Sequence, residues 1–131
     1  MTYLLDTDIC IGVLRQRPGM VECMSRVSPT DCAISMVTVY ELFCGLAKAQ
    51  DPIRERLKVE RFISALIELP LDRASADAAA KVRADLESQG NVIGPYDLLI
   101  AGQALAGGLT LVTNNVREFQ RVSGLNLQSW P

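Results

Sequence analysis

The chemistry open to this chain is limited first by a missing residue type. None of its 131 residues is histidine, which excludes a Ser-His-Asp triad, a Cys-His pair and a histidine-based nuclease site. The four cysteines form no C-x-x-C pair and lie among apolar residues, so we interpret Cys10, Cys23, Cys32 and Cys44 as small buried side chains and not as zinc ligands. Hydrolysis by this chain would therefore depend on carboxylates, with a metal ion as their natural partner.

Three carboxylates lie where a charge is costly unless it is compensated. Asp6 ends a short apolar run near the N-terminus, Glu41 interrupts an apolar helical stretch, and Asp97 follows Gly94-Pro95 at the start of another. Because burial of a charge requires a partner, we predict a functional role for all three acids. The alternatives are a capping or turn aspartate at Asp6, a solvated helix position at Glu41, and stabilisation of the helix dipole at Asp97.

Other polar side chains extend this candidate set. We interpret Asp8 as the cap of the helix that follows it. In the segment from Thr113 to Phe119, Asn115 or Asn114 could offer an amide oxygen, and Glu118 could reach a metal ion or a water molecule. The alternative for that segment is a polar turn followed by a surface acid. The predicted catalytic set is Asp6, Glu41, Asp97, Asn115 and Glu118, with Asp6, Glu41 and Asp97 as metal ligands.

Carboxylates that converge in this way would repel one another. A site of about −3 charge should raise at least one carboxyl pKa when no cation is bound. Mg²⁺ accepts oxygen ligands and Mn²⁺ suits the same set, so either ion would relieve the repulsion. A metal-activated water would then attack a phosphodiester directly, without a covalent enzyme intermediate.

Alternating apolar runs and helical patterns indicate how these residues are positioned. Strands are predicted at residues 3–5, 32–36, 67–71 and 109–113, with 125–130 as a candidate edge strand. Helices are predicted at residues 9–17, 20–27, 38–50, 53–66, 72–88, 94–106 and 116–122. This alternation predicts an α/β fold of one domain, residues 1–131, in which a parallel sheet lies between helices and ligands bind at the carboxyl ends of the strands.

Composition sets outer limits on location and on partners. Hydrophobic residues make up 49% of the chain and charged residues 21%, which is typical of a globular domain. No apolar run approaches the ~18 residues of a membrane span and no basic leader precedes Asp6, so we expect a cytoplasmic protein without membrane contact. The net charge of −2 argues against a broadly basic surface for nucleic acid. If the chain binds phosphate, a bound cation or a local cluster of basic residues would have to attract it.

Four segments of the chain carry a family resemblance. Leu4-Leu-Asp-Thr-Asp-Ile-Cys10, Ser35-Met-Val-Thr-Val-Tyr-Glu-Leu-Phe-Cys-Gly45, Gly94-Pro-Tyr-Asp-Leu-Leu-Ile-Ala-Gly102 and Leu111-Val-Thr-Asn-Asn-Val-Arg-Glu-Phe119 resemble the four motifs of VapC-type toxins, which are PIN-domain ribonucleases. One such motif is weak evidence, but all four occur here in the family's order and spacing over nearly the whole chain.

The resemblance implies a PIN-like three-layer sandwich with an acidic pocket that binds Mg²⁺ or Mn²⁺. Asp6, Glu41 and Asp97 match the family's three acids, and Asp6 and Asp97 are the firmest expected ligands. The fourth family acid falls near Asn115, where this chain has an amide, and Glu118 is the candidate substitute. That departure leaves a second metal site open.

The resemblance also implies an activity and partners. VapC-type toxins cut RNA, in many members tRNA and including initiator tRNA, and a VapB-type antitoxin holds them inactive by wrapping the toxin and presenting a basic residue to the acidic pocket. A toxin homodimer within a toxin–antitoxin hetero-oligomer is expected. Arg15, Arg17, Lys48 and Arg117 closely follow the motifs and could contact the RNA backbone, although each would equally suit a solvated helix surface.

Two other interpretations remain open at this point. Asp6-Thr7-Asp8 could begin a haloacid-dehalogenase-type phosphatase, but Cys10 replaces the expected Thr or Val, and the later lysine and aspartate pair are missing. The chain could also be a binding module that keeps the fold without catalysis, and the amide at Asn115 is the feature that favours this view.

Overall fold

A five-stranded parallel sheet forms the centre of the computed structural model, which describes residues 1–131. The strand order is β3-β2-β1-β4-β5, so β1 is the middle strand and pairs with both β2 and β4. The strands are β1 (Tyr3–Leu5), β2 (Cys32–Ser35), β3 (Ile67–Leu69), β4 (Thr110–Val112) and β5 (Asn126–Gln128). The predicted parallel sheet is confirmed, and its fifth strand lies at an edge beside β4.

Helices connect the strands and cover both faces of the sheet. They are α1 (Thr7–Leu14), α2 (Pro18–Ser25), α3 (Met36–Leu46), α4 (Pro52–Ser64), α5 (Arg73–Ser88), α6 (Pro95–Gly107) and α7 (Val116–Phe119), with a 3₁₀ turn at Pro29–Asp31. Proline occupies the first turn of α2, α4 and α6, where its missing N–H costs no helical hydrogen bond. Gly108 ends α6 in the left-handed region at φ 62°, which glycine adopts readily.

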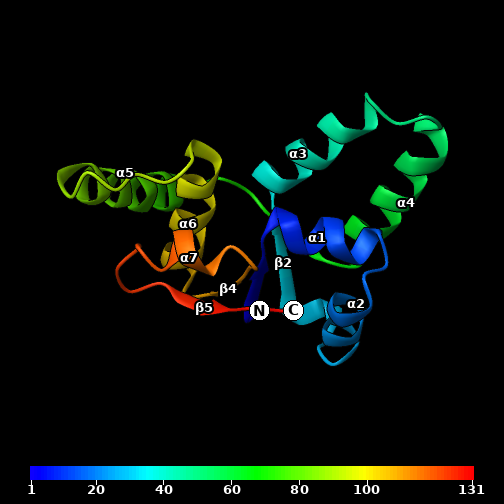
Figure 1. The fold of residues 1–131 in the computed structure, drawn as a ribbon, viewed down its shortest axis with the longest axis horizontal. Helices are drawn as coiled ribbons and strands as arrows, with labels where there is room; N and C mark the ends of the chain where they lie inside the picture. Colours follow the sequence, from blue (N-terminus) through cyan, green and yellow to red (C-terminus); the bar gives the residue numbers. More distant parts are fainter.

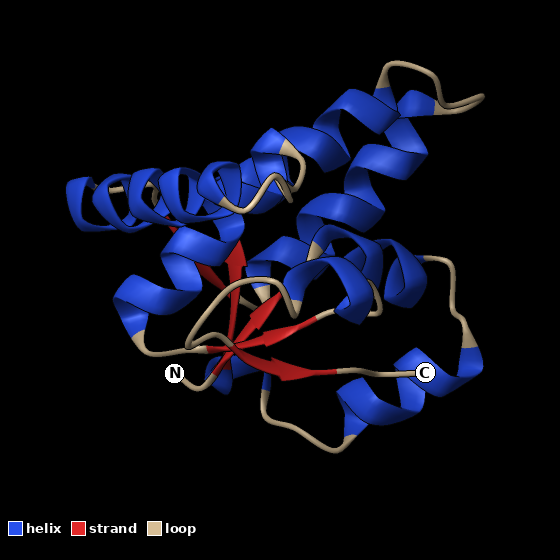
Figure 2. Cartoon of the chain, turned by 60° about the vertical axis from the view of Figure 1, so that its left-hand side comes forward, coloured by secondary structure: helices blue, strands red, loops and turns tan.

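Two hydrophobic cores lie on opposite faces of the sheet. Side chains alternate along a strand, so Leu5 enters one core and Leu4 the other. Helices α1 to α4 cover the first core, and α5, α6 and α7 cover the second (Figures 1 and 2). The predicted three-layer α/β sandwich is therefore confirmed. Both faces of the central strands are buried, which explains why these strands are continuous apolar runs.

The two covering layers are built differently. Helices α3 and α4 form a hairpin that projects beyond the sheet (Figure 1), and the guanidinium of Arg56 lies 4.6 Å from the centre of the Phe43 ring. Helices α5 and α6 pack closely at Gly102, where a Cβ atom would lie 2.7 Å from the carbonyl oxygen of Ser75. No helix is both long and apolar enough to cross a membrane.

Some predicted boundaries were wrong for local reasons. Helix α1 begins at Thr7 and its cap is Asp6, not Asp8, because the Asp6 side chain accepts from the Thr7 N–H. It ends at Leu14, and Gln16 turns the chain with a φ of 55°. Helix α3 begins at Met36 and not at Thr38, with Ser35 as its cap.

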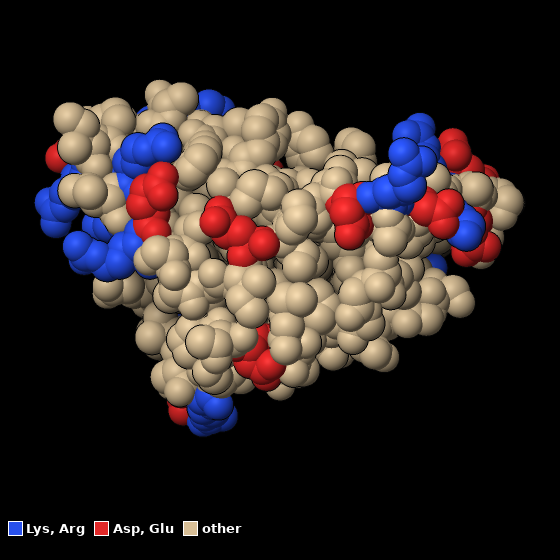
Figure 3. All heavy atoms as spheres, turned by 180° about the vertical axis from the view of Figure 1, so that it is seen from behind, with Lys and Arg blue, Asp and Glu red and all other residues tan.

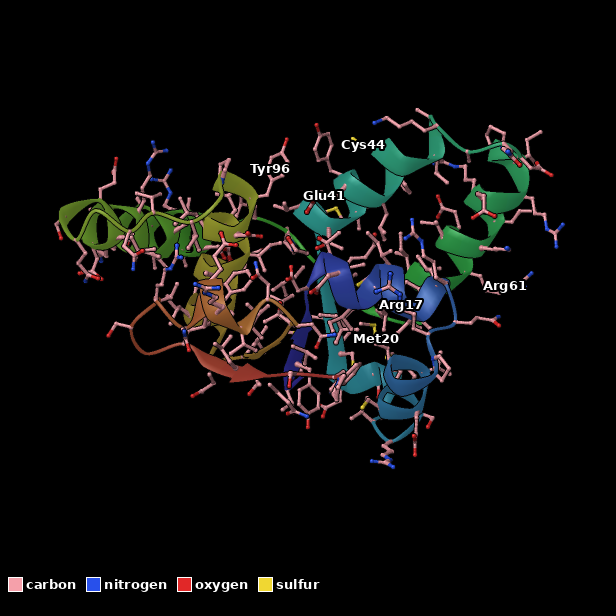
Figure 4. All side chains as sticks on the ribbon, viewed as in Figure 1. Arg17, Met20, Glu41, Cys44, Arg61 and Tyr96 are labelled. Atoms are coloured by element: carbon pink, nitrogen blue, oxygen red, sulfur yellow. The ribbon has the colours of Figure 1, made fainter.

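The cysteine interpretation holds for two of the four residues. Cys10 and Cys32 are buried, and burial raises the pKa of the Cys32 thiol to about 11. Cys44 is exposed and Cys23 is half-buried, so the prediction that all four are core residues was wrong. Cys44 lies on α3 beyond the sheet, where the hairpin has a solvent-facing side (Figure 4).

Candidate active site

The predicted acids come from three elements that meet at the carboxyl edge of the sheet. Asp6 follows β1, Glu41 lies on α3 directly after β2, and Asp97 lies in the first turn of α6. Figure 4 shows Glu41 and Tyr96 on facing sides of the space between α3 and α6. The topology therefore places these side chains in one region, as parallel strand ends require.

Asp6 is the most buried acid of this group, with 5% of its surface exposed. Its Oδ1 accepts from the Thr7 N–H at 2.8 Å, and its Oδ2 accepts from the Thr113 hydroxyl at 2.7 Å. Burial, followed by the nearby charge of Asp8, raises the pKa of Asp6 to about 7 despite these two hydrogen bonds. The chain thus holds a carboxyl group in one position where ionisation is unfavourable without a further partner.

Asp8 belongs to the same acidic group, although the sequence suggested only a cap. Its Oδ2 accepts from the Asn114 N–H at 3.1 Å, while its Oδ1 is buried and has no hydrogen-bond partner. Its charge raises the pKa values of both Asp6 and Asp97. The signal available in the sequence was its position two residues after Asp6, in the first turn of the same helix.

Glu41 is held in place by the N-terminal turn of α1. The Thr7 hydroxyl lies 2.8 Å from Glu41 Oε1 and 2.9 Å from the hydroxyl of Thr38. Glu41 is half-buried, as predicted from the apolar residues on its side of the helix. Thr7 therefore links α1 to α3, a contact that the sequence analysis missed.

Asp97 is also half-buried, and the group around it is strongly acidic. Burial, followed by the charge of Glu118, raises the pKa of Asp97 to about 6, and Glu41 and Asp8 add to the effect. The neighbouring Tyr96 packs edge-to-face on Tyr40 of α3, with ring centres 5.7 Å apart. This pair connects the helices that carry Asp97 and Glu41.

Glu118 and Asn115 form a bridge beside these acids. Glu118 Oε1 accepts from the Gly94 N–H at 3.0 Å, and its Oε2 accepts from Asn115 Nδ2 at 2.6 Å. These bonds, led by the Gly94 amide, lower the pKa of Glu118. Glu118 thus ties α7 to the residue that caps α6. The catalytic roles predicted for Asn115 and Glu118 stay predictions.

The C-terminus holds the loop between β4 and α7. Asn114 Nδ2 donates to the Trp130 carbonyl at 2.9 Å, and the Trp130 N–H donates to Asn114 Oδ1 at 3.1 Å. The Trp130 side chain is 2% exposed, and its ring lies 6.5 Å from that of Tyr3. This pairing fixes the segment that carries Thr113, the partner of Asp6.

The arrangement suits a cation. Asp6, Asp8, Glu41 and Asp97 carry hard carboxylate oxygens of the kind that Mg²⁺ and Mn²⁺ prefer, and Asp8 Oδ1 lacks any partner within the protein. In the structure, no group of three His, Cys, Asp or Glu side chains is placed so that it could hold a metal ion. Mutual repulsion of carboxylates favours such spread positions, so side-chain movement would have to accompany cation binding.

Comparison with known proteins identifies this type of domain. The family model described as PIN domain matches residues 3–125. The chain is similar to the tRNA(fMet)-specific endonuclease VapC of Shigella flexneri, with 40% identity over 130 residues that cover 99% of this chain and 98% of the relative. It is also similar to Ribonuclease VapC2 of Haemophilus influenzae, with 38% identity over 132 residues, 99% of this chain and 98% of the relative.

Solved structures agree with the sequence comparison. DNA-bound VapBC from Salmonella typhimurium superposes with a TM-score of 0.94 at 37% identity, covering 100% of this chain and 99% of that chain. VapBC2 from Rickettsia felis, bound to a promoter DNA fragment, gives a TM-score of 0.92 at 32% identity with 100% of both chains covered. This chain is a PIN domain and belongs to the VapC family of ribonuclease toxins.

Proposed function

We propose that the chain is a metal-dependent endoribonuclease toxin that cuts tRNA and is neutralised by a VapB-type antitoxin. The observation that carries this proposal is the acidic group at the sheet edge, where burial and like charge raise the pKa values of Asp6 and Asp97. Membership of the VapC family supports hydrolysis of a phosphodiester in RNA. The name of the Shigella flexneri relative supports tRNA as the substrate class.

Asp6, Asp97 and Glu41 would hold a Mg²⁺ or Mn²⁺ ion, and Asp8 is a further candidate because of its unpartnered oxygen. When bound, such an ion supplies Lewis-acid chemistry and offsets the negative charge of a phosphodiester. The protein's own contribution is positional: Thr113 fixes Asp6, and Thr7 fixes Glu41. These hydrogen bonds restrict the positions of the two carboxylates, so less side-chain movement is required when a cation binds.

Binding of an antitoxin is supported by a groove that leads away from Glu41. The groove has a volume of about 200 Å³ and is lined mainly by apolar side chains of α1, α3 and α4, among them Ile11, Leu14, Leu42 and Val59. An apolar peptide segment would fit there and place a basic residue beside Glu41. The similar solved structures are VapBC assemblies, which supports a VapB-type partner. A toxin homodimer within that complex remains part of the proposal.

The test uses purified toxin separated from its antitoxin. We expect tRNA cleavage with Mg²⁺ or Mn²⁺, no cleavage with EDTA, and a loss of at least ~100-fold in Asp97→Asn, because the substitution removes a charged ligand without changing its shape. Exposed Asp77→Asn on α5 is the matched control and should cut tRNA normally. Hydrolysis of an aryl phosphate in place of RNA would favour a phosphatase, and RNA binding without turnover would favour a binding module.

A further inference from the structure

A basic recess lies at the far end of the α3–α4 hairpin from the sheet. It has a volume of about 780 Å³ and lies between the end of α1, the end of α3 and the start of α4. Its charged lining consists of four basic and two acidic residues: Arg15, Lys48, Arg54, Lys58, Asp51 and Glu55. The recess thus has an excess of positive charge in a chain whose net charge is −2.

Most of the positive charge in this basic recess is free. Arg15, Lys48 and Arg54 take part in no ion pair, whereas Lys58 pairs with Glu55 at 3.3 Å. Both acids already have partners within the protein. Glu55 pairs with Lys58, and Asp51 Oδ1 accepts from the backbone N–H of Arg54 at 3.2 Å. The three free side chains therefore offer donors that no protein acid satisfies.

The opposite end of the molecule provides a contrast. Lys and Arg side chains gather at both ends in the view from behind (Figure 3). On α5, however, two of the three basic residues are paired, Lys81 with Asp77 at 2.9 Å and Arg83 with Glu87 at 3.5 Å, and Arg73 alone takes part in no ion pair. An excess of free positive charge thus characterises the basic recess and not every basic part of the surface.

The basic recess connects to the candidate active site. Arg15, Gly45, Ala49 and Glu55 line both the recess and the apolar groove that reaches Glu41. Glu41 lies five residues before Leu46, the last residue of α3, which corresponds to ~7.5 Å along the helix axis, and Lys48 lies two residues beyond that end. At ~3.4 Å per nucleotide of a stacked strand, the helical part of this spacing is roughly two nucleotides, and the two residues after α3 add to it.

We propose that the basic recess binds backbone phosphates of the RNA, roughly two to three nucleotides from the bond that is cut. This inference rests on the proposed ribonuclease function. The acidic edge repels phosphate until a cation is bound there, so a basic surface elsewhere on the molecule would add to the attraction that brings RNA to the site. Phosphate suits the lining better than a protein segment does, because only one of its nine residues is hydrophobic and the guanidinium groups of Arg15 and Arg54 can each bind phosphate with two donors.

Binding measurements on the whole toxin test the proposal. In the inactive Asp97→Asn background, the double variant Lys48→Ala/Arg54→Ala should bind tRNA roughly tenfold more weakly. Its plot of log affinity against log salt should be shallower by about 1.4, from ~0.7 per lost phosphate contact. Lys81→Ala/Arg83→Ala, which removes the same charge from α5, should match the parent in affinity and slope. With active enzyme, the recess variant should raise KM for tRNA and leave kcat within about twofold.

The outcomes separate this inference from the function on which it rests. An unchanged salt slope in the recess variant, with active wild-type enzyme, would overturn the recess proposal alone. Wild-type protein that neither binds nor cuts RNA would overturn the proposed function. If the recess variant lost affinity for its antitoxin but not for tRNA, the recess would be a site for an acidic protein segment. Unchanged melting temperatures would exclude misfolding as the cause.

Discussion

The Thr113 hydroxyl donates a hydrogen bond of 2.7 Å to Asp6 Oδ2, so a residue at the end of β4 holds the carboxylate at the end of β1 across a separation of 107 positions. The same hydroxyl oxygen accepts from the Asn115 N–H at 3.0 Å. Thr113 is fully buried, and its hydroxyl therefore has a fixed orientation. It is the direct link between the loop after β4 and the most buried acid.

Substitution of Thr113 tests whether this link matters for catalysis. Thr113→Val should raise the pKa of Asp6 further, because the hydrogen bond that it removes favours the ionised carboxylate. We expect tRNA cleavage at pH 7 to fall by about tenfold or more and the acidic limb of the pH–rate profile to move to higher pH. Thr113→Ser keeps the hydroxyl and should behave like wild type. A Val variant with a normal pH profile would contradict this role.

The raised pKa values of Asp6 and Asp97 predict an unusual dependence of stability on pH. In the metal-free protein, the folded state keeps protons on these groups up to about pH 7 and about pH 6, while the unfolded state releases them near the ordinary aspartate pKa of 3.8. The folded state therefore binds more protons between about pH 4 and pH 7, and stability falls as pH rises through this window. Melting in EDTA should occur at a lower temperature at pH 8 than at pH 5.

Asp6→Asn is the matched variant for this measurement. It removes the buried charge, so it should abolish tRNA cleavage and yet leave the metal-free fold as stable as wild type at pH 5 and more stable at pH 8. Most of the difference in melting temperature between pH 5 and pH 8 should disappear in this variant. If Asp6→Asn instead lowered the melting temperature strongly at both pH values, Asp6 would be a structural residue.

Thr7 offers an independent test of how Glu41 is positioned. Thr7→Val should leave Glu41 Oε1 without its 2.8 Å hydrogen bond and allow the carboxylate to change rotamer. A small misplacement of a catalytic group is expensive, so we expect kcat to fall by roughly 10- to 100-fold while KM for tRNA changes little. Thr7→Ser should restore the rate. Equal losses in the Ser and Val variants would mean that the hydroxyl is not the important feature.

The sequence was sufficient to predict the framework of the site. Asp6, Glu41 and Asp97 were found because each adjoins an apolar segment, and a parallel sheet brings the ends of such segments to one edge. Apolar runs also predicted the central strands β1, β2 and β4, because both faces of the sheet are covered there, whereas the edge strands β3 and β5 are more exposed. These features depend on local pattern and on topology, which a single sequence contains.

Contacts between distant side chains were not predictable in the same way. The sequence pattern favoured Asp8 over Asp6 as the helix cap, whereas the extended backbone at Asp6, with ψ 159°, makes Asp6 the cap. The partners of these acids, Thr113 and Asn114, were known only as members of a polar turn. Which hydroxyl or amide reaches which carboxylate depends on tertiary packing, and residue spacing does not encode it.

The pairing of Asn114 with Trp130 gives a prediction about the C-terminus. Asn114→Ala removes both hydrogen bonds to the Trp130 backbone, so the final residues should detach more easily. Because Trp130 is the single tryptophan and is buried, its fluorescence should shift to longer wavelength and become accessible to iodide. Unfolding free energy should fall by about 1–3 kcal/mol for the loss of two part-buried hydrogen bonds, at ~0.5–1.5 kcal/mol each.

Asn126→Ala is the matched control, since Asn126 is exposed on the edge strand β5. It should change neither fluorescence nor cleavage. In Asn114→Ala, tRNA cleavage should fall even at temperatures where the variant is fully folded. The substitution keeps the backbone N–H that donates to Asp8 Oδ2, but a loop released from Trp130 should hold this donor less firmly against the acidic group. An altered emission spectrum with an unchanged cleavage rate would show that the C-terminus stabilises the fold without positioning the site.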